Sequence, residues 1–236
     1  MPDVAQAVAQ IKLSVAPVVF LDTCVLLDVV RAPLRNAPEN VEAATELLRS
    51  ATCNPPKVHL VIACPTPTEW NEHIDEAFQD CEKAVKSVDA VSASCFFVGL
   101  PALAPMPAEL FTLPEHLKTL SKNLLDQSIL LDKDANALSR GIDRVINGRK
   151  PARRGGQGAK DAVILEHAVS LVDELLVGGF AGLRAFVSSN TGDFAKPNTI
   201  TIHPEIRTAF DQPRNIHYFA SLSAAVNWLK VSGWTP

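Results

Sequence analysis

Short apolar runs alternate with helical patterns along most of the chain. Continuous apolar stretches at 18–22, 58–64, 183–189 and 216–219 predict buried strands, because strands covered on both faces show no alternation of polar and apolar positions. Between these runs, apolar residues recur at the spacing of one helix face. Strands that alternate with helices predict an α/β fold, with a central, mostly parallel sheet between two helical layers.

The chain is expected to form one domain over residues 1–236, since no linker-like change of composition divides it. Helical patterns at 107–125 and 127–147 belong to a helical elaboration of the sheet over about 80–150. A basic loop follows at about 148–159, where glycines break the helical pattern.

Composition excludes several classes of protein. Hydrophobic residues make up 47% and charged residues 20%, as in ordinary globular proteins, and aromatic residues make up only 6%, few for a protein that stacks bases along a single strand. No run of about 18 apolar residues occurs, so we expect no membrane span. The five cysteines are scattered without a CxxC pair, which is typical of reduced thiols and favours a cytoplasmic location.

Acidic residues follow the predicted strands. Asp22 ends the first strand, Glu69 comes five residues after the second, and Asp193 follows the third. Asp161 precedes Ile164 by three residues and so begins the core-facing stripe of a helix. Ligands of such sheets bind beyond the carboxyl ends of the strands, so we expect these four carboxylates to lie together at one edge.

Each acid also has a structural interpretation. Asp22 could cap the following helix, a role compatible with ligand binding. Asp161 could be a favourable charge in a first helical turn, and Asp193 could be a turn residue. The joint placement of the acids, rather than any one of them, carries the hypothesis of a site.

Glu69 is the most ambiguous of the four. Residues 66–69, Thr-Pro-Thr-Glu, fit a capping box with proline at the first helical position. The sequence does not decide between a cap and a site for Glu69. Glu72 and Asp75 lie on the same helix and offer alternative carboxylates.

Four carboxylates in one crevice repel one another, and a bound divalent cation usually neutralises this repulsion. Ligands that are all oxygen favour Mg²⁺ or Mn²⁺ over zinc or copper. Because such ions also bind phosphate oxygens, the sequence points to phosphodiester chemistry. An aspartyl phosphohydrolase is disfavoured, since it would need a second Asp two residues after Asp22, where Cys24 stands.

Four segments carry a family resemblance: VVFLDTCVLLD (18–28), PTPTEW (65–70), GAKDAVILEHA (158–168) and FVSSNTGDF (186–194). In order and spacing they resemble the PIN-domain nucleases. The resemblance implies a three-layer α/β/α fold and hydrolysis of RNA, or of single-stranded or flapped DNA, with Mg²⁺ or Mn²⁺. Attack by an activated water would leave 5′-phosphate and 3′-hydroxyl ends.

The resemblance also assigns roles. The metal-binding and catalytic acids would be Asp22, Glu69, Asp161 and Asp193, and Thr23 and Asn190 would support them. Cys24 departs from the family pattern, which often has a polar residue there, and the extra length at 80–150 disfavours a small toxin ribonuclease. An antitoxin-like protein and a second copy of the chain remain open as partners. The alternative is an inactive PIN-like module that binds RNA or protein.

Charged residues are distributed unevenly along the chain, and the most basic segment directly precedes Asp161. The net charge is −4, yet residues 140–160 hold seven basic residues and one acidic one. Glycines let such a loop follow a nucleic-acid strand, and basic side chains bind its phosphates. We therefore expect substrate binding by five residues of this segment: Arg149, Lys150, Arg153, Arg154 and Lys160. The alternative is a solvated basic loop.

Overall fold

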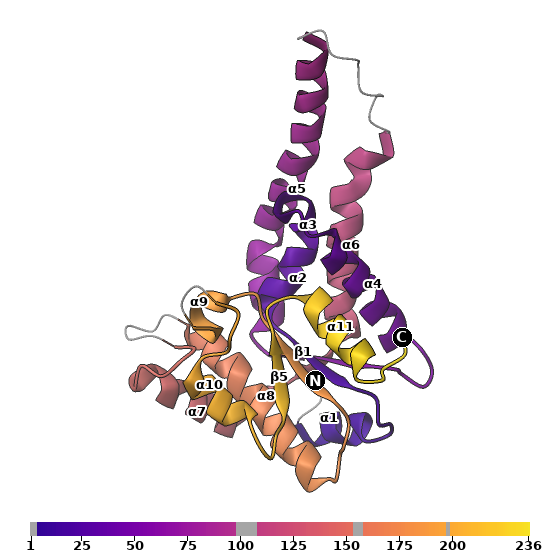
Figure 1. The fold of residues 1–236 in the computed structure, drawn as a ribbon. Helices are drawn as coiled ribbons and strands as arrows, with labels where there is room; N and C mark the ends of the chain where they lie inside the picture. The colour runs from indigo at the N-terminus through magenta and orange to yellow at the C-terminus, as the bar shows by residue number, and fades with distance from the viewer. Residues whose placement is uncertain (1–3, 98–107, 153–157, 197–198) are drawn as a thin grey trace.

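The fold is organised around one parallel sheet. The computed structural model describes residues 4–97, 108–152, 158–196 and 199–236. Within them, five strands pair in the order β3-β2-β1-β4-β5, and every pairing is parallel (Figure 1). The strands are β1 (Val18–Leu21), β2 (His59–Ala63), β3 (Ile129–Leu131), β4 (Arg184–Val187) and β5 (Ile216–Phe219). This confirms the predicted class of fold.

The strand order places a topological switch point between β1 and β4, which marks the position of the ligand crevice of such sheets. After β1 the chain moves to β2 and β3 on one side of the sheet, and after β4 it moves to β5 on the other side. The connections that follow these two neighbouring strands therefore diverge at their carboxyl ends. Such a switch point is where open α/β sheets bind ligands.

Helices cover both faces of the sheet. One layer contains α2 (Thr23–Val30), α4 (Pro38–Ala51), α5 (Thr66–Phe97), α6 (Leu113–Gln127) and α11 (Leu222–Val231). The other contains α1 (Val4–Ile11), α8 (Ala159–Val177) and α10 (Pro204–Phe210), with α7 (Ala135–Ile146) packed on α8. Shorter elements are α3 (Ala32–Arg35), α9 (Thr191–Phe194) and the 3₁₀ turn η1 (Ala108–Thr112). None of the described helices is both long and apolar enough to cross a membrane.

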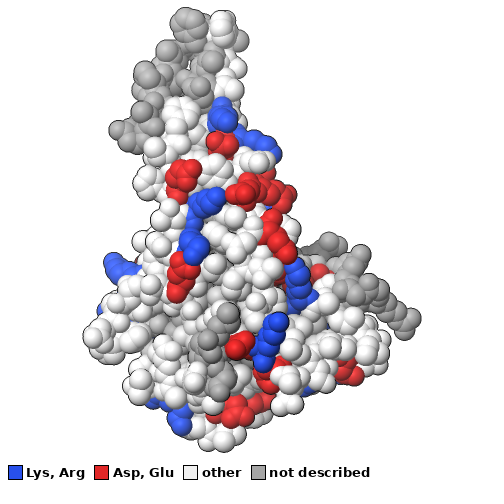
Figure 2. Space-filling model, turned by 180° about the vertical axis from the view of Figure 1, so that it is seen from behind, with Lys and Arg blue, Asp and Glu red and all other residues white. Residues whose placement is uncertain are grey.

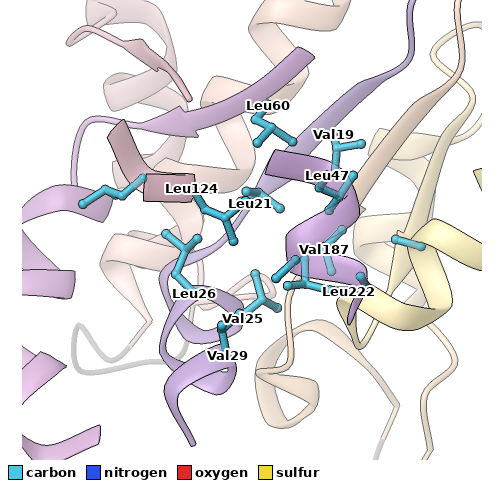
Figure 3. Packing of buried hydrophobic residues seen from close by; sticks show 14 of the residues in the cluster. Val19, Leu21, Val25, Leu26, Val29, Leu47, Leu60, Leu124, Val187 and Leu222 are labelled. Atoms are coloured by element: carbon cyan, nitrogen blue, oxygen red, sulfur yellow. The ribbon is translucent and has the colours of Figure 1, made fainter. Parts of the chain in front are cut away.

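Alternate residues of each strand enter two separate cores. Val19 and Leu21 of β1 join the layer of α2 and α6, and Phe20 joins the layer of α8. Figure 3 shows the first core, with Leu21 near Leu26 of α2 and Leu124 of α6. Because both faces of β1 are buried, its sequence is apolar throughout, as the pattern predicts.

The helices α5 and α6 extend beyond the sheet as a projecting pair (Figure 1). A buried polar bridge anchors the base of this pair. The indole Nε1 of Trp70 in α5 donates to Ser121 Oγ in α6 at 2.9 Å, and Ser121 Oγ donates to the carbonyl oxygen of Leu26 in α2 at 2.7 Å. One hydroxyl thus joins three helices next to the crevice.

One predicted element is wrong. Instead of one helix over 127–147, residues 129–131 form β3 at the edge of the sheet, and α7 begins at Ala135. Three apolar residues are too few to show a period, so pairing with β2 decides their conformation. Asp134 then caps α7 by accepting from the N–H groups of Asn136 and Ala137. Within the expected basic loop, residues 153–157 lie outside the described part of the chain.

We predict that Ser121→Ala destabilises the protein by about 1–3 kcal/mol, because the buried indole N–H and the Leu26 carbonyl both lose their partner. Urea unfolding followed by circular dichroism would measure the change. The matched control is Ser87→Ala, at an exposed position of α5 where the hydroxyl bonds only the carbonyl of Ala84. Equal stability of the two variants would contradict a structural role for the bridge.

Candidate active site

The structure brings the four predicted acids to the crevice between β1 and β4. Asp22 directly follows β1, and Asp193 lies in α9 just beyond β4. Glu69 lies in the first turn of α5, and Asp161 in the first turn of α8. Four elements far apart in sequence therefore each contribute one carboxylate, as the order of strands and acids predicts.

Asp22 is the most deeply placed acid, with only 2% of its surface exposed. It is the N-cap residue of α2, and its Oδ1 accepts from the N–H of Thr23 at 2.7 Å. Its Oδ2 accepts from Ser188 Oγ at 2.6 Å and from Cys24 Sγ at 3.1 Å. Burial raises the pKa of Asp22, and the charge of Glu69 adds to the rise, whereas these donors lower it. Capping and a place in the crevice therefore coexist.

Glu69 directs its carboxylate to side chains of the site. Its Oε2 accepts from Thr23 Oγ1 at 2.7 Å, and its Oε1 lies 3.5 Å from Lys160 Nζ. Thr66, which a capping box would use, has a buried hydroxyl with no hydrogen-bond partner among the described residues. These contacts favour the site over the capping box for Glu69. Glu72, the neighbouring alternative, is bound to Lys160 at 3.0 Å.

Asn190 joins the other two acids. Its Nδ2 donates to Asp161 Oδ2 at 3.0 Å and to Asp193 Oδ2 at 3.2 Å. Thr23 joins Asp22 and Glu69 in the same way, because its N–H donates to Asp22 and its hydroxyl donates to Glu69. The crevice therefore holds two carboxylate pairs, each bridged by one uncharged residue.

The two pairs act on each other electrostatically. The pKa of Asp161 is raised to about 7, first by burial and then by the negative charges of Asp22, Glu69 and Asp193. This effect shows that the four acids share one electrostatic environment. It is the pattern expected where buried carboxylates are gathered close together.

The residues of the crevice suit a hard divalent cation. Carboxylate and hydroxyl oxygens, which Mg²⁺ and Mn²⁺ prefer, come from the four acids, Thr23 and Ser188, and the crowded negative charge favours a multivalent ion. Across the described ranges, no three Asp, Glu, His or Cys side chains stand as a ready-made ligand group.

The basic residues divide into two groups. Arg149 pairs with Asp143 on the surface, and among the described residues it makes no ion pair with any of the four acids of the crevice. Arg153 and Arg154 lie outside the described residues. Lys150 and Lys160 reach the acids themselves, with Lys150 Nζ 3.4 Å from Asp193 Oδ1.

The described residues form no broad basic surface on the face behind that of Figure 1. Figure 2 shows the face behind that of Figure 1, where most of the described surface is uncharged and the acidic and basic side chains lie among one another. Any contact with a polyanion on this face would depend on a few well-placed cations.

Two contributors to the crevice are missing from the set that the sequence predicts. Ser188 donates the shortest hydrogen bond to Asp22, and Cys24 also donates to it while accepting from the N–H of Ser189. The sequence identifies Cys24 only as a departure from the family pattern. The signal for Ser188 is its position at the end of β4, but the sequence does not tell which of two adjacent serines faces β1.

A family comparison agrees with this geometry. A family model described as a PIN domain matches residues 19–194, which is most of the chain and includes all four acids. The protein belongs to the PIN domain family. Members of this family are generally nucleases and typically bind divalent metals. Searches of curated proteins and of solved structures found no match.

We predict that Asp161→Asn stabilises the metal-free protein at pH 8 by roughly 1 kcal/mol or more. The folded-state pKa of about 7 exceeds the ordinary value of 3.8, so the folded protein binds the proton more tightly than the unfolded chain. Wild-type stability should therefore fall as the pH rises from about 4 to about 7, and the variant should show a smaller fall.

Thermal unfolding in EDTA at pH 5 and pH 8 would measure this difference. Asp126→Asn, at an exposed carboxylate of α6 bound to Lys122, is the control and should keep the wild-type difference. A variant less stable than the wild type at pH 8 would show that Asp161 is not under electrostatic strain.

Proposed function

We propose that this PIN domain is a metal-dependent endoribonuclease that hydrolyses phosphodiester bonds at the crevice between β1 and β4. The observation that carries the proposal is the convergence of four carboxylates from four elements on the switch point of the sheet, two of them bridged by Thr23 and two by Asn190. Such a concentration of buried negative charge is costly unless a cation uses it. RNA is the substrate that the family resemblance favours.

The chain's own residues would divide the work. Asp22, Glu69, Asp161 and Asp193 would hold Mg²⁺ or Mn²⁺, which supplies charge compensation to the phosphate and lowers the pKa of water. The donors to Asp22 keep its carboxylate in one orientation, and Asn190 does the same for the opposite pair. Asp161 or Asp193 would orient the attacking water and accept its proton.

An inactive module that binds RNA or protein is the second candidate. It is favoured by the lack of a ready-made three-ligand group among the described residues and by the lysines that already pair with two of the acids. The two candidates differ in whether the crevice performs chemistry, so assays of cleavage separate them.

We predict that cleavage depends on a divalent metal. Chelator-treated protein should be inactive on single-stranded RNA of mixed sequence, and titration of Mn²⁺ or Mg²⁺ should restore cleavage, because the four acids alone offer a phosphate only repulsion. Product ends would be analysed by labelling, with 5′-phosphates expected. Cleavage that persists in excess EDTA would refute the metal mechanism, and a lack of cleavage at every metal concentration would favour the inactive module.

We predict that Asp22→Asn and Asp161→Asn each lower kcat by orders of magnitude while the protein stays folded, since each removes a charge from the metal-binding set. The control is Asp75→Asn, which removes an exposed carboxylate on α5 that pairs with Lys118. Retention of more than about a tenth of wild-type kcat would exclude that residue from the metal-binding set, because a tenfold change is only about 1.4 kcal/mol.

A further inference from the structure

Two lysine side chains lie at the two ends of the acid cluster. Lys150 Nζ lies 3.4 Å from Asp193 Oδ1 and donates to the carbonyl oxygen of Gly192 at 3.0 Å. Lys160 Nζ lies 3.5 Å from Glu69 Oε1 and 3.0 Å from Glu72 Oε2. Among the residues that the structure describes, each bridged carboxylate pair therefore has a lysine ammonium group at its end.

The position of Lys150 is built by contacts on both sides of its backbone. Its N–H donates to Glu205 Oε2 at 2.8 Å, and its carbonyl oxygen accepts from Arg144 Nη1 at 2.6 Å. Arg144 is itself held by the buried carboxylate of Glu166 at 2.5 Å. The ammonium group thus starts from a fixed backbone, and its side chain is only 24% exposed.

Lys160 is placed by a different device. It precedes Asp161 in the first turn of α8, so the helix that supplies one acid also supplies the cation for the neighbouring pair. Its side chain is 52% exposed and spans from α8 to the first two turns of α5. It is therefore held less firmly than Lys150.

A lysine in such a position competes with a divalent cation. Both are attracted to the same carboxylate oxygens, and a bound cation would repel an ammonium group that stayed beside it. An ammonium group displaced from a carboxylate at this edge remains close enough to bind a phosphate of the substrate, for which lysine is a common ligand.

We propose that Lys150 and Lys160 are exchangeable counter-ions of the crevice. While no divalent ion is bound, Lys150 and Lys160 form ion pairs with Asp193 and Glu69 and so oppose binding of the ion. Once the ion has bound, the two ammonium groups bind phosphates of the RNA. This inference rests on the proposed metal-dependent function. The exchange couples the two binding events, because RNA that binds the lysines frees the carboxylates that the metal needs. Such coupling is reciprocal, so bound metal also favours binding of RNA.

The test is the affinity for Mn²⁺ alone, measured by titration calorimetry without RNA at fixed ionic strength. Lys150→Met and Lys160→Met keep the apolar stem and remove the charge. We expect Mn²⁺ to bind about three- to tenfold more tightly to Lys150→Met and about twofold more tightly to Lys160→Met, within the range of partly exposed ion pairs. Lys118→Met, which breaks a 3.1 Å pair with Asp75 on the projecting helices, should leave the affinity unchanged.

A second readout must move in the opposite direction. On the Asp22→Asn background, where cleavage is not expected, and at an Mn²⁺ concentration that titration shows to saturate this variant, binding of a single-stranded RNA oligonucleotide should weaken several-fold when either lysine is replaced. Fluorescence anisotropy would measure it. A merely structural role of the lysines would weaken Mn²⁺ and RNA binding together, and that result would overturn the proposal.

The remaining outcomes are also decisive. Lys150→Arg retains the charge and should bind Mn²⁺ within about twofold of the wild type. If Lys150→Met does not fold, Lys160→Met on the exposed helix turn carries the test. Unchanged Mn²⁺ affinity in folded lysine variants would overturn this inference alone, whereas a wild type that binds no Mn²⁺ would overturn the metal-dependent function as well.

Discussion

Repulsion between carboxylates is the constraint on which the arrangement of the crevice depends. Asp22 is almost completely buried, and burial together with the negative charges of Asp22, Glu69 and Asp193 raises the pKa of Asp161 to about 7. Carboxylates brought together in this way destabilise a folded protein, since each disfavours the charge of the others. They stay together because their backbone positions are set by strand ends and first helical turns, whose location depends on the apolar cores and not on the acids.

The rest of the crevice offsets this repulsion with donors and cations. The N-terminus of α2 and the side chains of Ser188 and Cys24 serve Asp22, while Asn190 lies between the acids of the opposite pair. Lysines complete each pair at its outer end. The ammonium groups of this crevice can be exchanged for a divalent cation. This exchange links the electrostatics of the crevice to the proposed chemistry.

Helix α8 connects the acids with the basic segment. It carries Asp161 in its first turn and, further along, the buried Glu166, which binds Arg140 and Arg144. A buried ion pair is weak evidence for stability, because desolvation offsets its attraction. Here it fixes Arg144, whose contact with the Lys150 carbonyl places a cation against Asp193. The arginines that bind Glu166 thus serve the geometry of the segment, and the lysines face the acids.

The amino-acid pattern was sufficient to predict the parallel α/β fold, four of its strands and the edge of the sheet at which the acids meet. These features follow from local apolar patterns and from the rule that parallel strands end at one edge. Contacts in the folded chain were needed to establish that Ile129–Leu131 is a strand, that Glu69 faces Thr23 and Lys160, and that Ser188 donates to Asp22. They also separated the lysines of the basic segment from Arg149. Each of these outcomes depends on contacts between residues far apart in the chain, over distances of a few ångströms that no local pattern of side chains specifies.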